Sequence, residues 1–361
     1  MRKAFRASLL VLGLTLGATP AFAWGEQGHA AVCELAYRNF TPTSRLALID
    51  LFKAWSQRHG MGWRETRNEE LLYQRFMNSC IFEDAVRNRA ELSAFADISG
   101  HFVNYPRSKG TIADNEIACP VNSANQPTRC ILQVLERDMA RFKDASAVKA
   151  ERAEGLIGIG HWLGDIHQPL HLSFRDDKGG NDIKVSGACG RSGNLHSVWD
   201  TCLLMTGIWE PLRVKRNLRR TSNKRTIAFR IVDDWRASEA RPEVKQAVAG
   251  WITKTEPWQW AQESYRLTLS GMTGSFTENQ YCFKQPGTCT YSETHDRFSN
   301  NVSARTVDIS PAYIARYSVV VDERLRQAAY RLAWIVNESL DPAWDKQLPT
   351  CSVSGGTCPS G

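Results

Sequence analysis

Residues 313–340, YIARYSVVVDERLRQAAYRLAWIVNESL, decide the fold class because they form the longest and most regular helical pattern in the chain. Shorter helical patterns fill most of the remaining sequence. They cover residues 26–39, 42–55, 66–90, 130–143, 147–166, 194–206 and 240–270. Strand signals are sparse, and the best is a short extended piece at residues 182–186. The sequence therefore predicts an all-α fold, built as a single compact multi-helix domain.

The two ends of the chain differ in composition from this helical body. Residues 1–23 have a basic start, a short apolar stretch and small residues before Trp24, which is typical of a signal peptide. The apolar stretch is too short for a membrane span, and we find no other candidate span. We therefore expect a secreted or periplasmic protein that begins at Trp24, a single functional domain over residues 24–348, and a flexible tail over residues 349–361.

The ten cysteines are an even number, which in an exported chain favours disulfides over thiol chemistry. Three pairs of cysteines lie close enough in sequence for local bridges. Two of these pairs fall at the long loops 105–129 and 271–310. These local pairs are Cys119/Cys130, Cys282/Cys289 and Cys351/Cys358. The remaining four are Cys33, Cys80, Cys189 and Cys202. They can supply two more bridges, and their pairing stays open.

The net charge of the chain is +7, and it falls to +4 when residues 1–23 are left out. One run contributes much of the positive charge. It contains Arg213, Lys215, Arg216, Arg219, Arg220, Lys224 and Arg225. The run is either a solvated surface segment or a surface that helps to hold a polyanion.

Histidines and aspartates occur in a pattern that indicates metal binding. His161 and Asp165 are four residues apart, as are His196 and Asp200, and residues four apart share one face of a helix. His171 follows shortly after the first pair. One such pair is usually an ordinary surface pair, but two pairs with a third histidine favour a metal site. Imidazole and carboxylate together suit zinc.

Further candidate ligands lie towards the amino terminus. They are Trp24, His29, Asp84 and His101. Asp97 and Asp114 are alternatives to Asp84. The remaining histidines, His59, His167 and His295, are not expected to be ligands.

The order and spacing of these motifs resemble the secreted zinc-dependent nucleases of type I. This family comprises the single-strand nucleases and 3′-nucleotidases of fungi, plants and bacteria, and shares an all-α fold with zinc-dependent phospholipase C. The resemblance extends from Trp24 to about residue 340. It rests on Trp24-Gly25, His29, Asp84-x-x-Arg87, His101-Phe102, His161-x-x-x-Asp165, His171, Gly179-Gly180-Asn181 and His196-x-x-x-Asp200.

The resemblance implies three Zn²⁺ ions per chain. One would be held by Asp84, His101 and His161. Asp165 would bridge it to a second ion, which the backbone amine and carbonyl of Trp24 and the side chain of His29 would also hold. The third would be held by His171, His196 and Asp200. The amine of Trp24 would be available only after residues 1–23 are removed.

The resemblance also assigns roles towards substrate. Hydroxide held at the ions bridged by Asp165 would attack phosphorus in line, and the third ion would stabilise the leaving 3′-oxygen. Arg87 would clamp the phosphate, Phe102 would stack on an unpaired base, and Asn181 would line the base pocket. Each has a structural alternative: an ion-pair partner, a core residue and part of a plain turn. Asn104 departs from the family, in which several members carry aspartate, so that it can bind phosphate but not accept a proton.

The implied activity is hydrolysis of single-stranded DNA and RNA and of the 3′-phosphate of nucleotides. The alternatives are a phospholipase C with the same metal plan and a secreted protein that uses zinc only for folding. Phospholipases tend to have glutamate at the position of Asp200, and structural zinc sites are usually rich in cysteine. Both differences favour the nuclease.

Overall fold

The computed structural model describes most of the chain from Trp24 to Leu348. The described ranges are 24–60, 69–87, 98–106, 109–121, 129–175, 177–269, 278–279, 282–283 and 306–348. The expected signal peptide, the expected tail, Asp97 and His295 lie outside them, as do the bridges expected for Cys282/Cys289 and Cys351/Cys358. Among the described residues, no helix is both long and apolar enough to cross a membrane.

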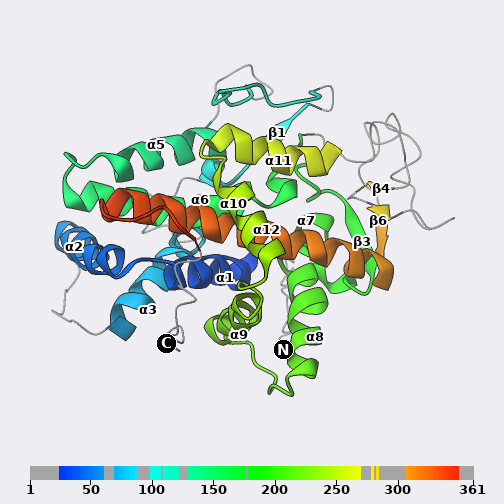
Figure 1. Cartoon of the computed structure of the whole chain (residues 1–361). Coiled ribbons are helices and arrows are strands. Elements are labelled where there is room, and N and C mark those ends of the chain that lie inside the picture. Colours follow the sequence, from blue (N-terminus) through cyan, green and yellow to red (C-terminus); the bar gives the residue numbers. More distant parts are fainter. Residues whose placement is uncertain are drawn as a thin grey trace, which may run out of the picture.

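Helices make up nearly all of the regular structure (Figure 1). The first half contains α1 (Gly25–Arg38), α2 (Pro42–Arg58), α3 (Glu69–Ser79), α4 (Phe82–Arg87), η2 (Ile98–His101), β1 (Val103–Tyr105), α5 (Ile131–Lys143), α6 (Lys149–Ile166), η3 (Pro169–His171) and β2 (Leu172–Phe174). The second half contains β3 (Lys184–Gly187), η4 (Gly190–Ser192), α7 (Leu195–Ser197), the π-helical segment η5 (Val198–Trp209), α8 (Glu210–Lys215), α9 (Lys224–Arg236), α10 (Pro242–Ile252), α11 (Pro257–Leu269), β4 (Glu278–Asn279), β5 (Cys282–Phe283), β6 (Thr306–Ile309) and α12 (Pro311–Leu340). The all-α prediction is confirmed.

Local sequence explains where the main helices begin. Thr41 caps α2, because its hydroxyl accepts a hydrogen bond from the Ser44 amide at 3.1 Å, and Pro42 occupies the first helical position. Ser310 and Pro311 start α12 in the same way. Asn223 caps α9, whose start carries no proline.

Helix α6 is the centre of the fold. It packs between α5 and α2, while α1 packs against α9 and α12. Every residue of α6 from Gly155 to Ile166 is buried, as expected for a helix that is apolar on all sides. Glycines allow this close packing, since a Cβ at Gly155 would come within 2.6 Å of the Asp138 carbonyl oxygen on α5. The polar residues of α6 are therefore carried into the interior.

Tertiary contacts change several predicted elements. The single helix expected over 66–90 is two helices, α3 and α4, interrupted at Cys80–Ile81. The helix expected over 240–270 is interrupted between α10 and α11, and the one expected over 194–206 is mostly π-helical and continues into α8. Helix α9 was not predicted. The extended piece near 182–186 is β3, which pairs in parallel with β6.

Three disulfides lie within the described residues. Cys119–Cys130 is the local bridge that the sequence predicts. The four cysteines left open pair as Cys33–Cys80 and Cys189–Cys202. Cys33–Cys80 spans 47 residues and joins α1 to the interruption between α3 and α4. It thereby fixes the segment that leads into Asp84.

Candidate metal centre

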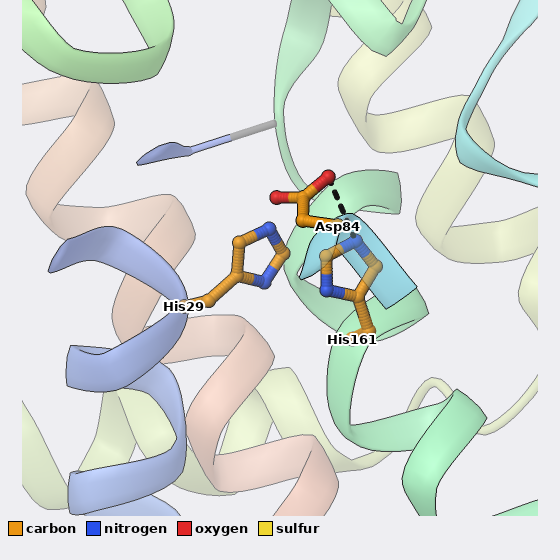
Figure 2. Close-up of side chains that lie close together, drawn as sticks. All are labelled: His29, Asp84 and His161. Carbon is orange, nitrogen blue, oxygen red and sulfur yellow. Dashed lines mark ion pairs between the residues drawn. The ribbon is translucent and has the colours of Figure 1, made fainter. Parts of the chain in front are cut away.

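Three elements distant in sequence bring polar side chains to one buried point. His29 comes from α1, Asp84 from α4 and His161 from α6, and Figure 2 shows their side chains pointing towards one another. Their candidate ligand atoms all lie within 4.8 Å of one another. The His29 and His161 rings stack with centroids 4.0 Å apart, and all three side chains are almost wholly buried. The site is therefore built by helix packing.

Asp165 lies at the middle of this cluster, one helical turn after His161. Its Oδ2 atom is 2.9 Å from His101 Nδ1 and 3.3 Å from His161 Nε2. Its Oδ1 atom is 3.2 Å from His29 Nε2. The two oxygens of one carboxylate thus face different histidines, which is the arrangement expected of a carboxylate between two ions.

A further group of three ligands lies beside this cluster. It consists of His171, His196 and Asp200, whose candidate ligand atoms also fall within 4.8 Å of one another. The two imidazole rings stack with centroids 4.9 Å apart. His196 and Asp200 are four residues apart, across the junction of α7 and η5, so their shared helix face survives the π-helical geometry.

The structure brings all eight side chains predicted as ligands into these groups. The group of His171, His196 and Asp200 has the predicted membership. The other two predicted sets merge, because His29 lies with Asp84 and His161, while His101 lies with His161 and Asp165. Asp114, the described alternative to Asp84, is exposed and belongs to none of the groups.

Backbone carbonyls orient three of the histidines. His161 Nδ1 lies 2.9 Å from the Cys80 oxygen, and His196 Nδ1 lies 2.6 Å from the Gly179 oxygen. His171 makes the same contact with the His101 carbonyl at 2.5 Å. Each contact fixes the protonated nitrogen, so that Nε2 faces the cluster with a free lone pair. Histidines that bind metals usually have such a partner on the opposite nitrogen.

Several buried polar atoms in the cluster lack hydrogen-bond partners among the described residues, although His29 Nε2 and Asp165 Oδ1 lie at ion-pair distance from each other, 3.2 Å. These atoms are both ring nitrogens of His29, both carboxylate oxygens of Asp84, His101 Nε2, Asp165 Oδ1 and His171 Nε2. Leaving such groups unsatisfied in the interior costs about 1–3 kcal/mol each. Histidine nitrogen and carboxylate oxygen are also zinc donors. The residues present therefore fit a bound metal.

The electrostatics of the cluster are dominated by burial and by its carboxylates. Burial lowers the pKa of His29 and of His101, and it lowers that of His171 to about 4. Burial also opposes the charged form of His161, but Asp165 and Asp84 outweigh it and raise the pKa of His161 to about 9. Burial thus favours the neutral, ligating form of His29, His101 and His171, whereas His161 must release its extra proton when it binds a metal.

Trp24 lies at the edge of the cluster and is completely buried. Its indole Nε1 donates a 2.6 Å hydrogen bond to the Gly164 carbonyl on α6. Its backbone has φ +20°, which is unusual for a residue other than glycine. A Cβ at the next residue, Gly25, would lie 3.5 Å from the Asp200 carbonyl oxygen. Trp24 and Gly25 therefore lie beside α6 and η5, the helices that carry Asp165 and Asp200.

The residues predicted to bind substrate lie around the metal centre to different extents. Asn104 is on β1, which pairs in parallel with β2 directly after His171, and a Cβ at Gly179 would lie 3.4 Å from its Oδ1 atom. Phe102 is half-buried beside His101. Asn181 donates to the Lys178 carbonyl at 2.8 Å within its turn. Arg87 ends the helix that carries Asp84, and its side chain lies outside the described part of the structure.

Sequence reasoning missed the residues that support the ligands. Gln168 Nε2 donates a 2.7 Å hydrogen bond to Asp200 Oδ1. Gly179 and Gly180 both have positive φ, and a Cβ at Gly179 would lie 2.4 Å from the Leu170 carbonyl oxygen. Only glycine fits there, and the turn offers its carbonyl to His196. The Gly-Gly-Asn motif is the sequence signal for this turn. From the sequence we assign it to a base pocket or a plain turn and not to the support of His196.

Together the fold and the site define an all-α protein with a buried histidine–aspartate metal centre. Residues 24–341 match the family model described as S1/P1 Nuclease, so the chain belongs to this family. The family is zinc-dependent, and the three groups above are able to hold metal.

Curated relatives include plant and fungal nucleases. Endonuclease 2 and Endonuclease 3 of Arabidopsis thaliana are 25% and 30% identical, each over 55% of this chain and over 62% and 60% of their own lengths. Nuclease P1 of Penicillium citrinum is 27% identical over 49% of this chain and 57% of its own length. The matched part of this chain thus spans about 60% of the length of these relatives.

Proposed function

We propose that this protein is a zinc-dependent hydrolase that cleaves phosphodiester bonds of single-stranded DNA and RNA and removes the 3′-phosphate of nucleotides. The observation that carries the proposal is the buried His/Asp cluster around Asp165, whose donor atoms lack partners among the described residues. Membership of the S1/P1 nuclease family and the names of the relatives support the same activity.

In this proposal, the protein holds three zinc ions. Asp84, His101 and His161 would hold one, Trp24 and His29 would hold a second, and His171, His196 and Asp200 would hold a third, with Asp165 shared by the first two. When bound, zinc polarises phosphoryl oxygens and makes water nucleophilic at neutral pH. The packing of α1, α4 and α6 keeps the first two groups adjacent.

The remaining residues orient the substrate. Asn104 presents an amide beside the His171 group, where it can donate to a phosphate oxygen but cannot accept a proton. Phe102 stacks on an unpaired base, which disfavours duplexes. Arg87 follows Asp84 by one helical turn and clamps the phosphate with its fork of donors. Gln168 keeps Asp200 oriented through its 2.7 Å hydrogen bond.

We also propose export and removal of residues 1–23. The amine of Trp24 then becomes a metal donor, whereas the amide nitrogen of the precursor is a poor one. Protein with Trp24 as its verified first residue should bind one zinc more than a chain that retains residues 1–23, and should be far more active. Equal metal content and activity of the two forms would refute this role of Trp24.

The central experiment assays the chain beginning at Trp24 on single-stranded DNA, RNA, a 3′-nucleotide and phosphatidylcholine. Each assay is run before and after chelation and zinc add-back, with metal counted by elemental analysis. Chelator-sensitive cleavage of nucleic acid with about three zincs per chain is the expected result. Cleavage of lipid alone would identify a phospholipase, and bound zinc without hydrolysis would identify a structural centre.

A further inference from the structure

The positive charge of the chain is concentrated in one short segment outside the metal centre. Residues 210–225 contain seven lysines and arginines but a single acid, Glu210, which gives a net charge of +6. The whole of residues 24–361 has a net charge of only +4. The rest of the protein is therefore slightly acidic, and the net positive charge comes from this segment.

In the structure this segment comprises α8, the connection to α9 and the first turn of α9, at the lower edge of Figure 1. Lys215, Arg219 and Arg220 are exposed, and no ion pair is found for them among the described residues. Other cations of the segment are paired, such as Arg216 with Asp234 at 2.7 Å. These cations lie on the surface without a close ion-pair partner, although Arg220 acts electrostatically on Glu210.

A groove of about 400 Å³ lies next to the exposed cations, between η5, α9 and α12. Lys215, Arg241 and Arg326 contribute positive charge to its lining, while Ile208 and Val319 contribute apolar surface. Two acids also line the groove. Asp234 pairs with Arg216 at 2.7 Å, and Asp322 accepts from Trp235 Nε1 at 2.6 Å and lies 3.9 Å from Arg326. The lining thus carries three cations and two acids beside apolar surface. Arg241 and Arg326 lie near Glu243 and Asp322, whereas no ion pair is found for Lys215 among the described residues.

The groove is separate from the metal centre but connected to it by a continuous helix. Asp200 is near the start of η5, which runs directly into α8 and ends at Lys215. Lys215 follows Asp200 by fifteen residues. At the α-helical rise of about 1.5 Å per residue, the separation along the axis is at most about 22 Å, because the π-helical part is more compact. A strand of several nucleotides can span this distance, whereas a mononucleotide or dinucleotide cannot.

We propose that the groove and the exposed cations of residues 215–220 bind the phosphate backbone of a single-stranded nucleic acid whose scissile bond lies at the metal centre. Basic grooves with apolar surface for bases are how proteins hold single strands without sequence preference. The inference rests on the proposed function. Its consequence is that long strands bind more tightly than short ones, while the chemical step is the same for both.

The main test compares two triple variants with equal loss of charge. The first is Lys215→Ala/Arg219→Ala/Arg220→Ala. The control is Lys143→Ala/Lys149→Ala/Lys346→Ala, which removes exposed lysines from other parts of the surface. For the first variant, we expect KM for a 30-nucleotide strand to rise about tenfold, and kcat and KM for a dinucleotide to stay within twofold. The slope of log Kd against log salt should fall by about 2, since each contact with a single strand contributes about 0.7.

A second pair of variants tests the groove itself. Val319 lines the groove and is 67% exposed, whereas Val148 is 64% exposed and precedes α6. Val319→Glu adds a negative charge within the groove and should weaken binding of the long strand several-fold. Val148→Glu should leave that binding unchanged. Equal effects of the two substitutions, or of the two triple variants, would overturn the proposal.

Binding to metal-stripped protein separates this inference from the proposed function. Fluorescence anisotropy with a labelled 30-nucleotide strand should still show binding that depends on Lys215, Arg219 and Arg220. If that binding occurs but the zinc-loaded protein does not cleave the strand, the proposed function is wrong, while the groove is still a binding site for nucleic acid. If the triple variant loses binding to phosphatidylglycerol vesicles but not to the strand, the surface binds lipid and the proposal is wrong.

Discussion

Two buried polar clusters lie close together along α6 and differ in how their atoms are satisfied. His161 and Asp165 belong to the metal-binding cluster, where several donor and acceptor atoms lack protein partners. His167, only two residues later, faces α12 instead. Its Nδ1 lies 2.7 Å from the Leu163 oxygen, and its Nε2 accepts from Arg331 at 2.5 Å.

The cluster around His167 is satisfied by protein groups alone. Glu263 accepts from both terminal nitrogens of Arg331 at 2.7 and 2.9 Å, and from Arg324 at 2.8 Å. Burial alone would raise the pKa of Glu263, but the two arginines hold it below its usual value. The comparison shows that burial of a histidine does not indicate function; unsatisfied ligand atoms beside carboxylates do.

The largest expected effect is on the metal-binding side of this comparison. His161→Ala removes a ligand that both groups around Asp165 share. We expect at least one zinc to be lost, and kcat on single-stranded DNA to fall by about a thousandfold or more, because the metal supplies several kcal/mol of transition-state stabilisation. Elemental analysis and steady-state kinetics measure the two losses. Full metal content with full activity would contradict the assignment.

Glu263→Gln tests the cluster around His167. The substitution keeps the size of the side chain but leaves Arg324 and Arg331 as buried cations without a counter-ion. The free energy of unfolding should fall by about 3–5 kcal/mol, as when one partner of a buried ion pair is removed. Urea denaturation measures this loss. Metal content and kcat per folded molecule should remain within about twofold, and a selective loss of zinc would show that the two clusters are not independent.

Gln168 lies between the two clusters and should have an intermediate effect. Gln168→Ala removes the hydrogen bond to Asp200 without removing a ligand. Partners of this kind contribute about 10–100-fold to metal affinity or activity. Zinc affinity measured by chelator competition should therefore weaken within that range, while the unfolding midpoint of the metal-free protein should change little. A larger effect on folding than on metal affinity would make Gln168 a structural residue.

The smallest expected effect is the acid sensitivity of the Glu263 cluster. Because the pKa of Glu263 is lower when folded than when unfolded, its contribution to stability is complete above the unfolded value of about 4.5. It is lost progressively as the pH falls from there towards the lower folded value. Metal-free protein should thus lose stability on acidification below about pH 4.5. Glu263→Gln should lose less over the same range, and parallel curves would rule out this contribution.

Much of the fold could be predicted from sequence because helical patterns are local. The helices at residues 25–38, 131–143, 149–166 and 311–340 lie within two residues of the predicted bounds. The predictions were wrong where tertiary packing interrupts a continuous pattern, as at Cys80, which is tied to α1 by a disulfide. Helix α9 was not predicted, although Ile227, Ile231 and Trp235 form a buried stripe at helical spacing directly after the basic run.

The sequence by itself determined the all-helical class, the residue types at the site and the family resemblance, because spacing along one helix fixes which side chains share a face. The tertiary structure decided the rest. It placed His29 beside His161, paired the four open cysteines, and turned His167 towards Arg331 rather than towards the metal centre. These are contacts between residues up to 164 positions apart, which depend on how helices pack and which no local pattern encodes.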